Sequence, residues 1–514
     1  MPQELDITQK LKERLTNFEQ KLEVSKEGTI ISNRDGLIEI VGLPKVGWSE
    51  VLINDKDKRA LAMTVTDELV QAIALDDAQE FPVGSTIKST DKILDTIVGD
   101  QLLGRVIDPL GRAIDGLGDI DTRKHRPIER IAPGVIERQP VNEPLPTGVS
   151  AVDALIPIGK GQRELIIGDR QTGKTAIALD AIINQAKSKT GVISVYVAIG
   201  QKMNKIRRIT EILRENGALE NTVIVAASSG SPASWQFIAP FVGCAIAEEV
   251  MEKGGHSLIV YDDLTKQAWA YREISLLLKR PPSREAYPGD IFFLHSRLLE
   301  RASKLSDERG GGSMTALPII ETQAGDISAY IPTNVISITD GQIYLEGDLF
   351  YAGVRPAVNV GLSVSRVGSK AQPPVMKQIA SQLRLELAQA RELAAFAQFA
   401  SDLDDTTKQK IERGKRLTEI LKQPDLEPLS VTEQASRILM VVRGHLETIE
   451  LEDIAQTIQD FQDFIKLEKP PILKTLEKGT KLEDKDFEDF DKIAKKFLDT
   501  KIISNEEPTK KAKK

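Results

Sequence analysis

The sequence predicts a multidomain protein: an N-terminal β-barrel, a central α/β domain built around a phosphate loop (P-loop), and a C-terminal α-helical bundle. Short β-type runs separated by turn signals fill the region before residue 95. A complete G-x-x-x-x-G-K-T element follows in an alternating strand–helix pattern, and β-type runs disappear beyond residue 372. The predicted segments are an amphipathic helix at residues 1–25, the barrel at 26–95, the α/β domain at 96–372, the helical domain at 373–502 and a disordered tail at 503–514.

The composition is ordinary for a globular protein with several domains. The chain has 514 residues, of which 41% are hydrophobic and 28% charged, and a net charge of −8 argues against nucleic acid as the main partner. One cysteine, Cys244, rules out a disulfide framework and a thiolate metal site, and we expect it to be a buried structural thiol. No apolar run approaches the ~20 residues that span a bilayer, and the N-terminus carries no secretory or transit signal. We therefore expect a cytosolic protein or one peripheral to a membrane.

The N-terminal segment has the pattern of one amphipathic helix. Its apolar side chains recur at intervals of three or four residues. They are Ile7, Leu11, Leu15, Phe18 and Leu22. A helix placed before any visible core either docks on a partner or packs on its own domain, and we favour docking.

Regularly spaced β-type runs follow, at residues 28–31, 37–41, 51–53 and 72–75, with a turn signal at 33–36. This spacing predicts a small β-barrel or sandwich. No catalytic constellation lies in this region, so we assign it a structural or assembly role.

The central region alternates β-rich and helical runs after the P-loop. Its predicted strands are residues 192–199, 222–227, 257–261, 315–320 and 335–338. The alternation predicts a mostly parallel sheet with helices on both faces, and nucleotide at the carboxyl ends of the strands.

Beyond residue 372 the pattern is helical, with loops at 402–405 and 423–428, and a helical bundle fits it. Residues 505–514 combine Pro508 with acidic residues and four lysines. We interpret them as a disordered tail; a functional lysine patch is the alternative.

The P-loop motif lies between an apolar run and a helix-like run, the context that phosphate binding requires. Its glycines let the backbone turn tightly and direct N–H groups toward one anion, and the helix N-terminus adds partial positive charge. We expect Lys174 to reach the β- and γ-phosphates of a nucleoside triphosphate, and the Thr175 hydroxyl to bind Mg²⁺. The motif residues are Gly168, Asp169, Arg170, Gln171, Thr172, Gly173, Lys174 and Thr175.

Two strand ends complete the predicted nucleotide site. Residues 258–262 form an apolar run ending in Asp262, the Walker B arrangement, and this carboxylate is placed to hold Mg²⁺ opposite Thr175. Gln201 ends another strand, where a nucleotide hydrolase needs a group that activates water. A glutamine amide is not a base at neutral pH. The sequence therefore predicts a site that binds nucleotide and is poorly equipped to hydrolyse it.

Arg366 follows a short apolar strand and precedes a Gly-Ser turn. An arginine placed in this way either reaches a phosphate across a subunit interface, as an arginine finger, or forms a surface ion pair. Spacing alone favours the ion pair.

Six motifs together resemble the alpha subunit of the rotary (F-type) ATP synthase. They are residues 168–175, 196–202, 261–264, 280–290, 321–326 and 363–368. The resemblance extends over about residues 5–500. It implies a RecA-like central domain that binds ATP or ADP with Mg²⁺. It also implies alpha subunits that alternate with catalytic beta subunits in a hexameric ring around a gamma shaft.

The resemblance also implies roles for individual residues. Arg170, Gln171, Lys174 and Thr175 would contact the phosphates and Mg²⁺, and Asp262 would belong to the Mg²⁺ shell. Gln201 stands where the beta subunit has its catalytic glutamate. The remaining implied roles concern Arg366 as a finger for the neighbouring beta site, Ser363 on the strand needed for activity, and Phe350, Arg355 and Gln423 around the adenine.

The resemblance further implies contact with a delta subunit or peripheral stalk through the N-terminus, and attachment to a membrane rotor. The expected location is the cytoplasmic face of a bacterial plasma membrane or the stromal face of a plastid thylakoid. Asp425 replaces a second glutamine near the adenine, and residues 227–232 and 33–48 are also atypical. A catalytic subunit of a related rotary or secretion ATPase is the first alternative, and Gln201 argues against it. A hexameric RecA-like helicase is the second, and the acidic charge argues against it.

Overall fold

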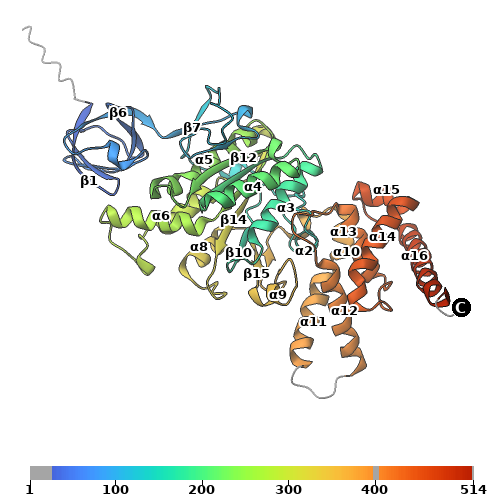
Figure 1. The fold of residues 1–514 in the computed structure, drawn as a ribbon. Coiled ribbons are helices and arrows are strands. Elements are labelled where there is room, and N and C mark those ends of the chain that lie inside the picture. Colours follow the sequence, from blue (N-terminus) through green and yellow to red (C-terminus); the bar gives the residue numbers. More distant parts are fainter. Residues whose placement is uncertain (1–25, 398–403, 512–514) are drawn as a thin grey trace, which may run out of the picture. The chain divides into compact units, whose positions relative to one another are not determined.

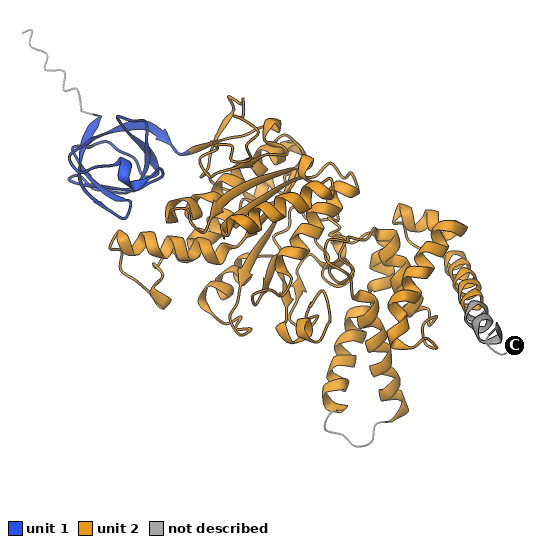
Figure 2. Cartoon of the chain, viewed as in Figure 1, with its two compact units in different colours: residues 1–94 blue, residues 95–514 orange. Residues whose placement is uncertain are grey.

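The computed structural model describes residues 26–397 and 404–511. The chain divides into two compact units at Leu94/Asp95 (Figure 1, Figure 2). The first unit contains the barrel, and the second contains the α/β sheet and the C-terminal helices. The helix predicted at residues 1–25 lies outside the described residues, so docking by this helix stays a prediction.

The first unit is a closed six-stranded barrel, as predicted. The strands pair in the order β1 (Glu27–Arg34), β2 (Leu37–Val41), β5 (Val70–Ala74), β4 (Arg59–Val65), β3 (Glu50–Asn54) and β6 (Thr86–Ile93). Inward-facing side chains such as Ile38, Ile40 and Leu52 are fully buried and form its core. All neighbouring strands are antiparallel, and closure leaves no unpaired sheet edge.

The second unit is built on one eight-stranded sheet. Its order is β16 (Val364–Ser365), β15 (Gly341–Leu345), β10 (Leu165–Gly168), β14 (Ser313–Glu321), β13 (His256–Asp262), β11 (Ile193–Gln201), β12 (Thr222–Ser228) and β8 (Val106–Ile107). Every neighbouring pair is parallel except β15 and β16. The mostly parallel sheet predicted from the alternating pattern is therefore confirmed. A separate pair joins β7 (Asp95–Ile97) and β9 (His125–Pro127).

Helices cover both faces of this sheet (Figure 1). One face packs in the same hydrophobic cluster as α3 (Lys174–Lys187) and α4 (Met203–Glu215), through strand residues such as Tyr196 and Val260. The other face packs on α5 (Ala233–Glu252), where a Cβ added to Gly243 would lie 2.3 Å from the Val197 side chain. Glycine therefore sets the close approach of α5. The remaining helices around the sheet are α2 (Ser150–Leu155), α6 (Leu264–Leu277), α7 (Ile291–Leu299), α8 (Tyr330–Ile338) and α9 (Gly347–Tyr351).

The strand predicted at residues 335–338 is wrong, because these residues end helix α8. Its buried apolar residues include Ile331, Val335 and Ile338, which are spaced by four and three as on one helical face. The β-branched residues in this run suggested a strand. They form a helix instead, because a helix buries Val335 and Ile338 on one face. The strand lies just beyond, at β15.

A buried ion pair joins α5 to the segment after α7. The Arg301 guanidinium donates to both carboxylate oxygens of Glu248 at 2.7 and 2.6 Å, and to the Ile128 carbonyl oxygen at 2.6 Å. Both side chains are 1% exposed. Cys244 is also fully buried, as predicted, and burial raises the pKa of its thiol to about 12.

The C-terminal region is helical, as predicted, and aromatic residues such as Phe461, Phe490 and Phe497 pack in its core. Its helices are α10 (Pro374–Ala380), α11 (Leu383–Ala397), α12 (Asp405–Leu421), α13 (Val431–Val442), α14 (Ile454–Glu468), α15 (Pro471–Lys478) and α16 (Asp484–Lys511). One hydrophobic cluster includes both sheet and helical-domain residues. The boundary predicted at 372/373 therefore stays a prediction.

The disordered tail predicted from residue 503 overlaps the end of helix α16 and stays a prediction. Helix α16 continues through this position to Lys511.

Candidate nucleotide-binding site

The P-loop connects the end of β10 to the start of α3 at the carboxyl edge of the sheet. Gly173 has φ of +98°, with no atom within 4 Å of where a Cβ would lie, and Gln171 has φ of +60°. A Cβ on Gly168 would lie 2.5 Å from the Leu345 carbonyl oxygen. Gly173 is therefore required for its left-handed backbone, and Gly168 is required because β10 packs closely against the end of β15.

Lys174 is held against the loop by backbone carbonyls. Its ammonium donates to the carbonyl oxygen of Gly168 at 2.8 Å and to that of Asp169. The side chain is 8% exposed, and burial lowers the pKa of Lys174 although nearby carboxylates such as Glu321 and Asp263 oppose this shift. A phosphate anion bound at the loop would compensate the charge of this buried ammonium through charge-assisted hydrogen bonds.

Neighbouring segments fix the P-loop backbone. The Asp169 carboxylate accepts hydrogen bonds from the Thr322 hydroxyl at 2.6 Å and the Gly325 N–H at 2.9 Å, and the Thr172 hydroxyl donates to the Asp169 carbonyl oxygen. Arg170 extends into solvent, where its Nε donates to the Glu321 carboxylate at 2.7 Å. Asp169 and Thr172 thus support the loop internally, whereas Arg170 and Gln171 are exposed on it.

Asp262 is the centre of the polar network beside the P-loop. It is 3% exposed, and its carboxylate accepts hydrogen bonds from the Thr175 hydroxyl at 2.9 Å and the Tyr196 hydroxyl at 2.5 Å. The Lys205 ammonium contacts both the Thr175 hydroxyl and the Asp262 carboxylate, each at 3.2 Å. The structure therefore brings the two predicted metal ligands together. Sequence reasoning missed Tyr196 and Lys205, although Lys205 lies only four residues after Gln201, in the first turn of α4.

This oxygen pair fits Mg²⁺. Mg²⁺ prefers hydroxyl, carboxylate and water oxygens, and Thr175 and Asp262 supply the first two. The Lys205 ammonium on both oxygens shows that the position attracts a cation. Among the described residues, no group of three or more His, Cys, Asp and Glu side chains has an arrangement that would hold a metal alone. Phosphate oxygens and water would therefore complete the shell.

Gln201 binds Asp262 through its amide. Its Nε2 donates to the Asp262 carboxylate at 2.9 Å and to the Asp262 carbonyl oxygen at 3.2 Å. A glutamate at this position would face the same carboxylate with like charge. Gln201 therefore fixes Asp262 and supplies no base for deprotonating water.

The three residues predicted around the adenine lie close together. The Arg355 guanidinium carbon lies 4.4 Å from the centroid of the Phe350 ring, and the Gln423 N–H donates to the Arg355 carbonyl oxygen at 2.9 Å. The Gln423 amide is 6% exposed and bonds Ser150 and the carbonyls of Gly148 and Glu427. The hydrogen-bonding groups of the Gln423 amide are therefore satisfied within the fold, whereas Arg355 is exposed and Phe350 is half-buried.

Asp425 acts on a buried carboxyl of α3. Burial raises the pKa of Asp180 to about 7, and the negative charge of Asp425 adds to this shift. Asp180 is 4% exposed, and one of its carboxyl oxygens has no hydrogen-bond partner. The unusual acidic residue at position 425 therefore disfavours ionisation of Asp180.

We expect Asp180→Asn to stabilise the chain increasingly as pH rises from about 4 to about 7. The folded-state pKa lies above the unfolded value near 3.8, so the wild type loses stability as pH rises through this window, by at most about 1.4 kcal/mol per pH unit. Urea unfolding midpoints at several pH values measure the difference. Asp425→Asn should act in the same direction but less strongly, and a pH-independent difference for Asp180→Asn would contradict the assignment.

Arg366 lies just beyond the start of β15, at the opposite end of the strands from the P-loop, whereas Ser363 lies beside the middle of β15. The Ser363 hydroxyl is fully buried, donates to the Asn359 carbonyl oxygen at 2.6 Å and accepts the Tyr344 N–H at 2.9 Å. Ser363 therefore holds the segment before β16 in place. Arg366 is exposed, and within the described residues its guanidinium has no hydrogen bond or ion pair. The surface ion pair favoured from spacing alone is absent there.

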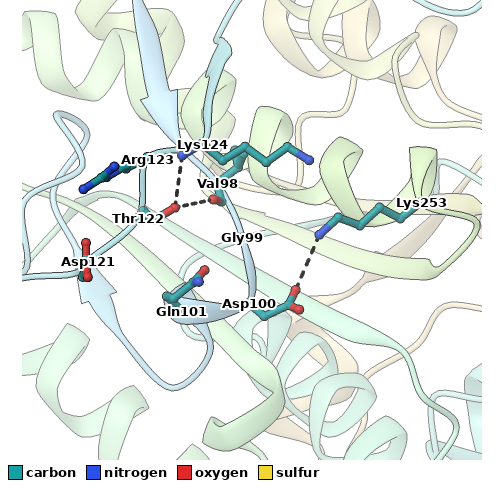
Figure 3. A pocket seen from close by; sticks show the side chains of 9 residues that line it. All are labelled: Val98, Gly99, Asp100, Gln101, Asp121, Thr122, Arg123, Lys124 and Lys253. Carbon is teal, nitrogen blue, oxygen red and sulfur yellow. Dashed lines mark hydrogen bonds and ion pairs between the residues drawn. The ribbon is translucent and has the colours of Figure 1, made fainter.

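A separate polar pocket of about 490 Å³ lies in the second unit (Figure 3). Ion pairs and hydrogen bonds occupy much of its lining, such as Lys253 with Asp100 at 3.7 Å and the Thr122 hydroxyl with the Val98 carbonyl oxygen at 3.1 Å. It contains none of the predicted nucleotide residues.

The described helices include none long and apolar enough to span a membrane.

The fold and the site together define a P-loop nucleotide-binding protein with a barrel before its α/β domain and a helical domain after it. Residues 148–365 match the ATP synthase alpha/beta family, nucleotide-binding domain, and residues 372–497 match the ATP synthase alpha/beta chain, C terminal domain. The two matches cover about two thirds of the sequence. The chain belongs to the ATP synthase alpha/beta family, and it is a subunit of a rotary ATPase.

We expect Lys174→Ala to weaken ATP binding by roughly 10- to 150-fold, because one charge-assisted hydrogen bond contributes about 1.5–3 kcal/mol. Isothermal titration of the purified chain with ATP measures the change. Lys187→Ala is the matched control, since this lysine lies at the other end of α3. Equal affinities for Lys174→Ala and the control would contradict the role of Lys174.

Proposed function

We propose that the chain is the non-catalytic, regulatory alpha subunit of a proton-translocating ATP synthase. The observation that carries this proposal is the Gln201 amide bound to Asp262 at 2.9 Å, at the position where a catalytic subunit needs a base. The P-loop, Asp262 and Thr175 support tight binding of Mg-ATP. Binding without hydrolysis suits a subunit whose nucleotide stabilises or regulates the assembly.

Different residues of the chain bind the phosphates and the metal ion. The loop N–H groups and Lys174 hold the phosphates, and Thr175 and Asp262 hold Mg²⁺, which screens the phosphate charge when bound. Lys205 must release its contacts with Thr175 and Asp262 to admit the metal. Phe350 offers an aromatic face at the adenine side of the site.

The position of Arg366 supports its assignment as a finger for a neighbouring site. Ser365 pairs with Gly341 at the start of β15, whereas Leu345 at the end of β15 pairs with Gly168 at the P-loop. At about 3.3 Å per residue, these two ends lie roughly 13 Å apart. Arg366 is one residue beyond Ser365, on the side away from the chain's own nucleotide. An exposed guanidinium there is suited to another subunit's phosphate.

The proposed partners are catalytic beta subunits in an alternating ring, a central gamma shaft, and a delta subunit or peripheral stalk bound by residues 1–25. The complex would attach to a membrane through its rotor, at the cytoplasmic face of a bacterial plasma membrane or the stromal face of a thylakoid. No role for nucleic acid is proposed.

Two measurements on the purified full chain test the subunit role. We expect it to bind one Mg-ATP with little hydrolysis alone, and to form an active ring when mixed with a catalytic subunit of the same family. Gln201→Asn is the control variant. It keeps a neutral amide and adds no base, so we expect it to hydrolyse as little ATP as the wild type does. Vigorous hydrolysis by the isolated chain would instead identify it as a catalytic subunit.

A further inference from the structure

Lys205 is a second ammonium group beside the P-loop, in addition to Lys174, and it belongs to none of the nucleotide-binding motifs. Its Nζ lies 3.2 Å from both the Thr175 hydroxyl and the Asp262 carboxylate. The Lys205 side chain is 39% exposed, whereas that of Asp262 is 4% exposed. Lys205 therefore reaches these buried oxygens from the solvent side, and its ammonium can move away from them without unpacking the core.

Helix stability does not explain a lysine at this position. Lys205 lies in the first turn of α4, which contains no acidic residue, and the N-cap residue Lys202 forms no side-chain cap. A helix N-terminus carries partial positive charge, so a cation in the first turn is disfavoured. The ion pair with the buried Asp262 carboxylate opposes this cost. The position of the Lys205 ammonium is therefore explained by the nucleotide site and not by the helix.

Lys205 and Mg²⁺ compete for the same two oxygens. Oδ2 of Asp262 accepts hydrogen bonds from the Thr175 and Tyr196 hydroxyls in addition to its contact with the ammonium. Mg²⁺ requires near-ideal octahedral geometry at about 2.0–2.1 Å from its ligands, so the ammonium must leave when the metal binds here. The flexible stem of a lysine allows this movement.

A nucleotide bound without a metal would need another positive charge at this end of the P-loop. Carboxyl groups surround the Lys174 ammonium closely enough to act on it electrostatically, so the phosphates enter a site that already contains negative charge. These groups are Asp169, Asp262, Asp263 and Glu321. An ammonium that contacts Thr175, the residue after Lys174, lies at the start of the helix that binds the phosphates. A small shift from Thr175 would bring it to a phosphate oxygen, with which it forms a charge-assisted hydrogen bond.

We propose that Lys205 replaces Mg²⁺ as a counter-charge for the phosphates, so that this site also binds metal-free ATP or ADP. When Mg²⁺ binds Thr175 and Asp262, Lys205 releases both oxygens and the metal takes over this role. The inference rests on the proposed Mg-ATP site and extends it to the metal-free nucleotide. It does not depend on whether the chain hydrolyses ATP.

Isothermal titration of the isolated full chain with ATP, in excess EDTA and in excess Mg²⁺, tests the proposal. The wild type should bind ATP in both conditions. We expect Lys205→Met to weaken binding roughly 10- to 150-fold in EDTA, the effect of losing one charge-assisted hydrogen bond, and at most about threefold in Mg²⁺. Arg207→Met is the matched control and should change neither affinity, since this exposed cation of the same helix pairs with Glu211.

Lys205→Arg separates the positive charge from other effects of the substitution. Because it keeps a cation, it should bind metal-free ATP within about threefold of the wild type. Equal losses of affinity for Lys205→Met in the two conditions would overturn the proposal, and so would undetectable binding of ATP by the wild type in EDTA. Vigorous hydrolysis by the isolated chain would defeat the non-catalytic role, while the difference between EDTA and Mg²⁺ would still decide the role of Lys205.

Discussion

In a ring reconstituted with catalytic subunits, Arg366→Ala should reduce steady-state ATP hydrolysis by about 10³–10⁵, or roughly 4–7 kcal/mol of barrier. The charge that develops on the transferred phosphoryl group would lose its counter-charge at the neighbouring site. The ATP affinity of this chain's own site should stay nearly constant, because Arg366 lies at the end of the strands opposite the P-loop. Titration calorimetry and turnover on the same preparation separate the two effects.

Arg366→Lys distinguishes a finger from a simple positive charge. An ammonium lacks the planar fork that grips two phosphate oxygens, so this variant should recover little turnover. Arg207→Ala is the matched control, since this exposed arginine forms a surface pair with Glu211 and, within the described residues, no other ion pair. Turnover of Arg366→Ala within a few-fold of the control would defeat the finger assignment.

The second large effect concerns stability. Arg301→Met should destabilise the chain by about 3–5 kcal/mol, because it leaves the Glu248 carboxylate uncompensated in a site where both partners are 1% exposed. Urea unfolding followed by circular dichroism measures the loss. The Ile128 carbonyl oxygen would also lose its donor.

A double variant shows how much of this loss of stability comes from the unpaired Glu248 carboxylate. Glu248→Met combined with Arg301→Met should recover most of the stability, since apolar residues often replace a buried ion pair at little cost. Arg297→Met, which removes a guanidinium paired with the partly exposed Glu129, serves as control and should cost less. Equal losses for the single Arg301 variant and this control would contradict the account.

The P-loop and the parallel sheet were predictable because their signals are local. A fixed motif between an apolar run and a helix-like run specifies strand, turn and helix together. The barrel was predictable from regularly spaced β-type runs. Residues 335–338 misled because a four-residue segment with three β-branched apolar residues fits either structure, and the helical spacing appears only when Ile331 is included.

The supporting residues of the site were not predictable in the same way. Tyr196 lies within an apolar strand, and only the three-dimensional structure shows its hydroxyl on Asp262 at 2.5 Å. Lys205 belongs to no motif of the predicted site, and its contact with Asp262 joins residues 57 apart along the chain. Long-range contacts of this kind leave no periodic trace in a single sequence.

The separation of the two sheet ends has a consequence for symmetry. If Arg366 serves a neighbouring site as proposed, a subunit that binds its own nucleotide at one end of the strands and presents Arg366 at the other meets its two neighbours through different surfaces. Such head-to-tail contacts are heterologous, and they give a closed ring only if the rotation between neighbours sums to a full turn. A two-fold dimer of this chain would place like surfaces together and leave each finger without a phosphate. The proposed finger role therefore implies a cyclic assembly and not a two-fold dimer.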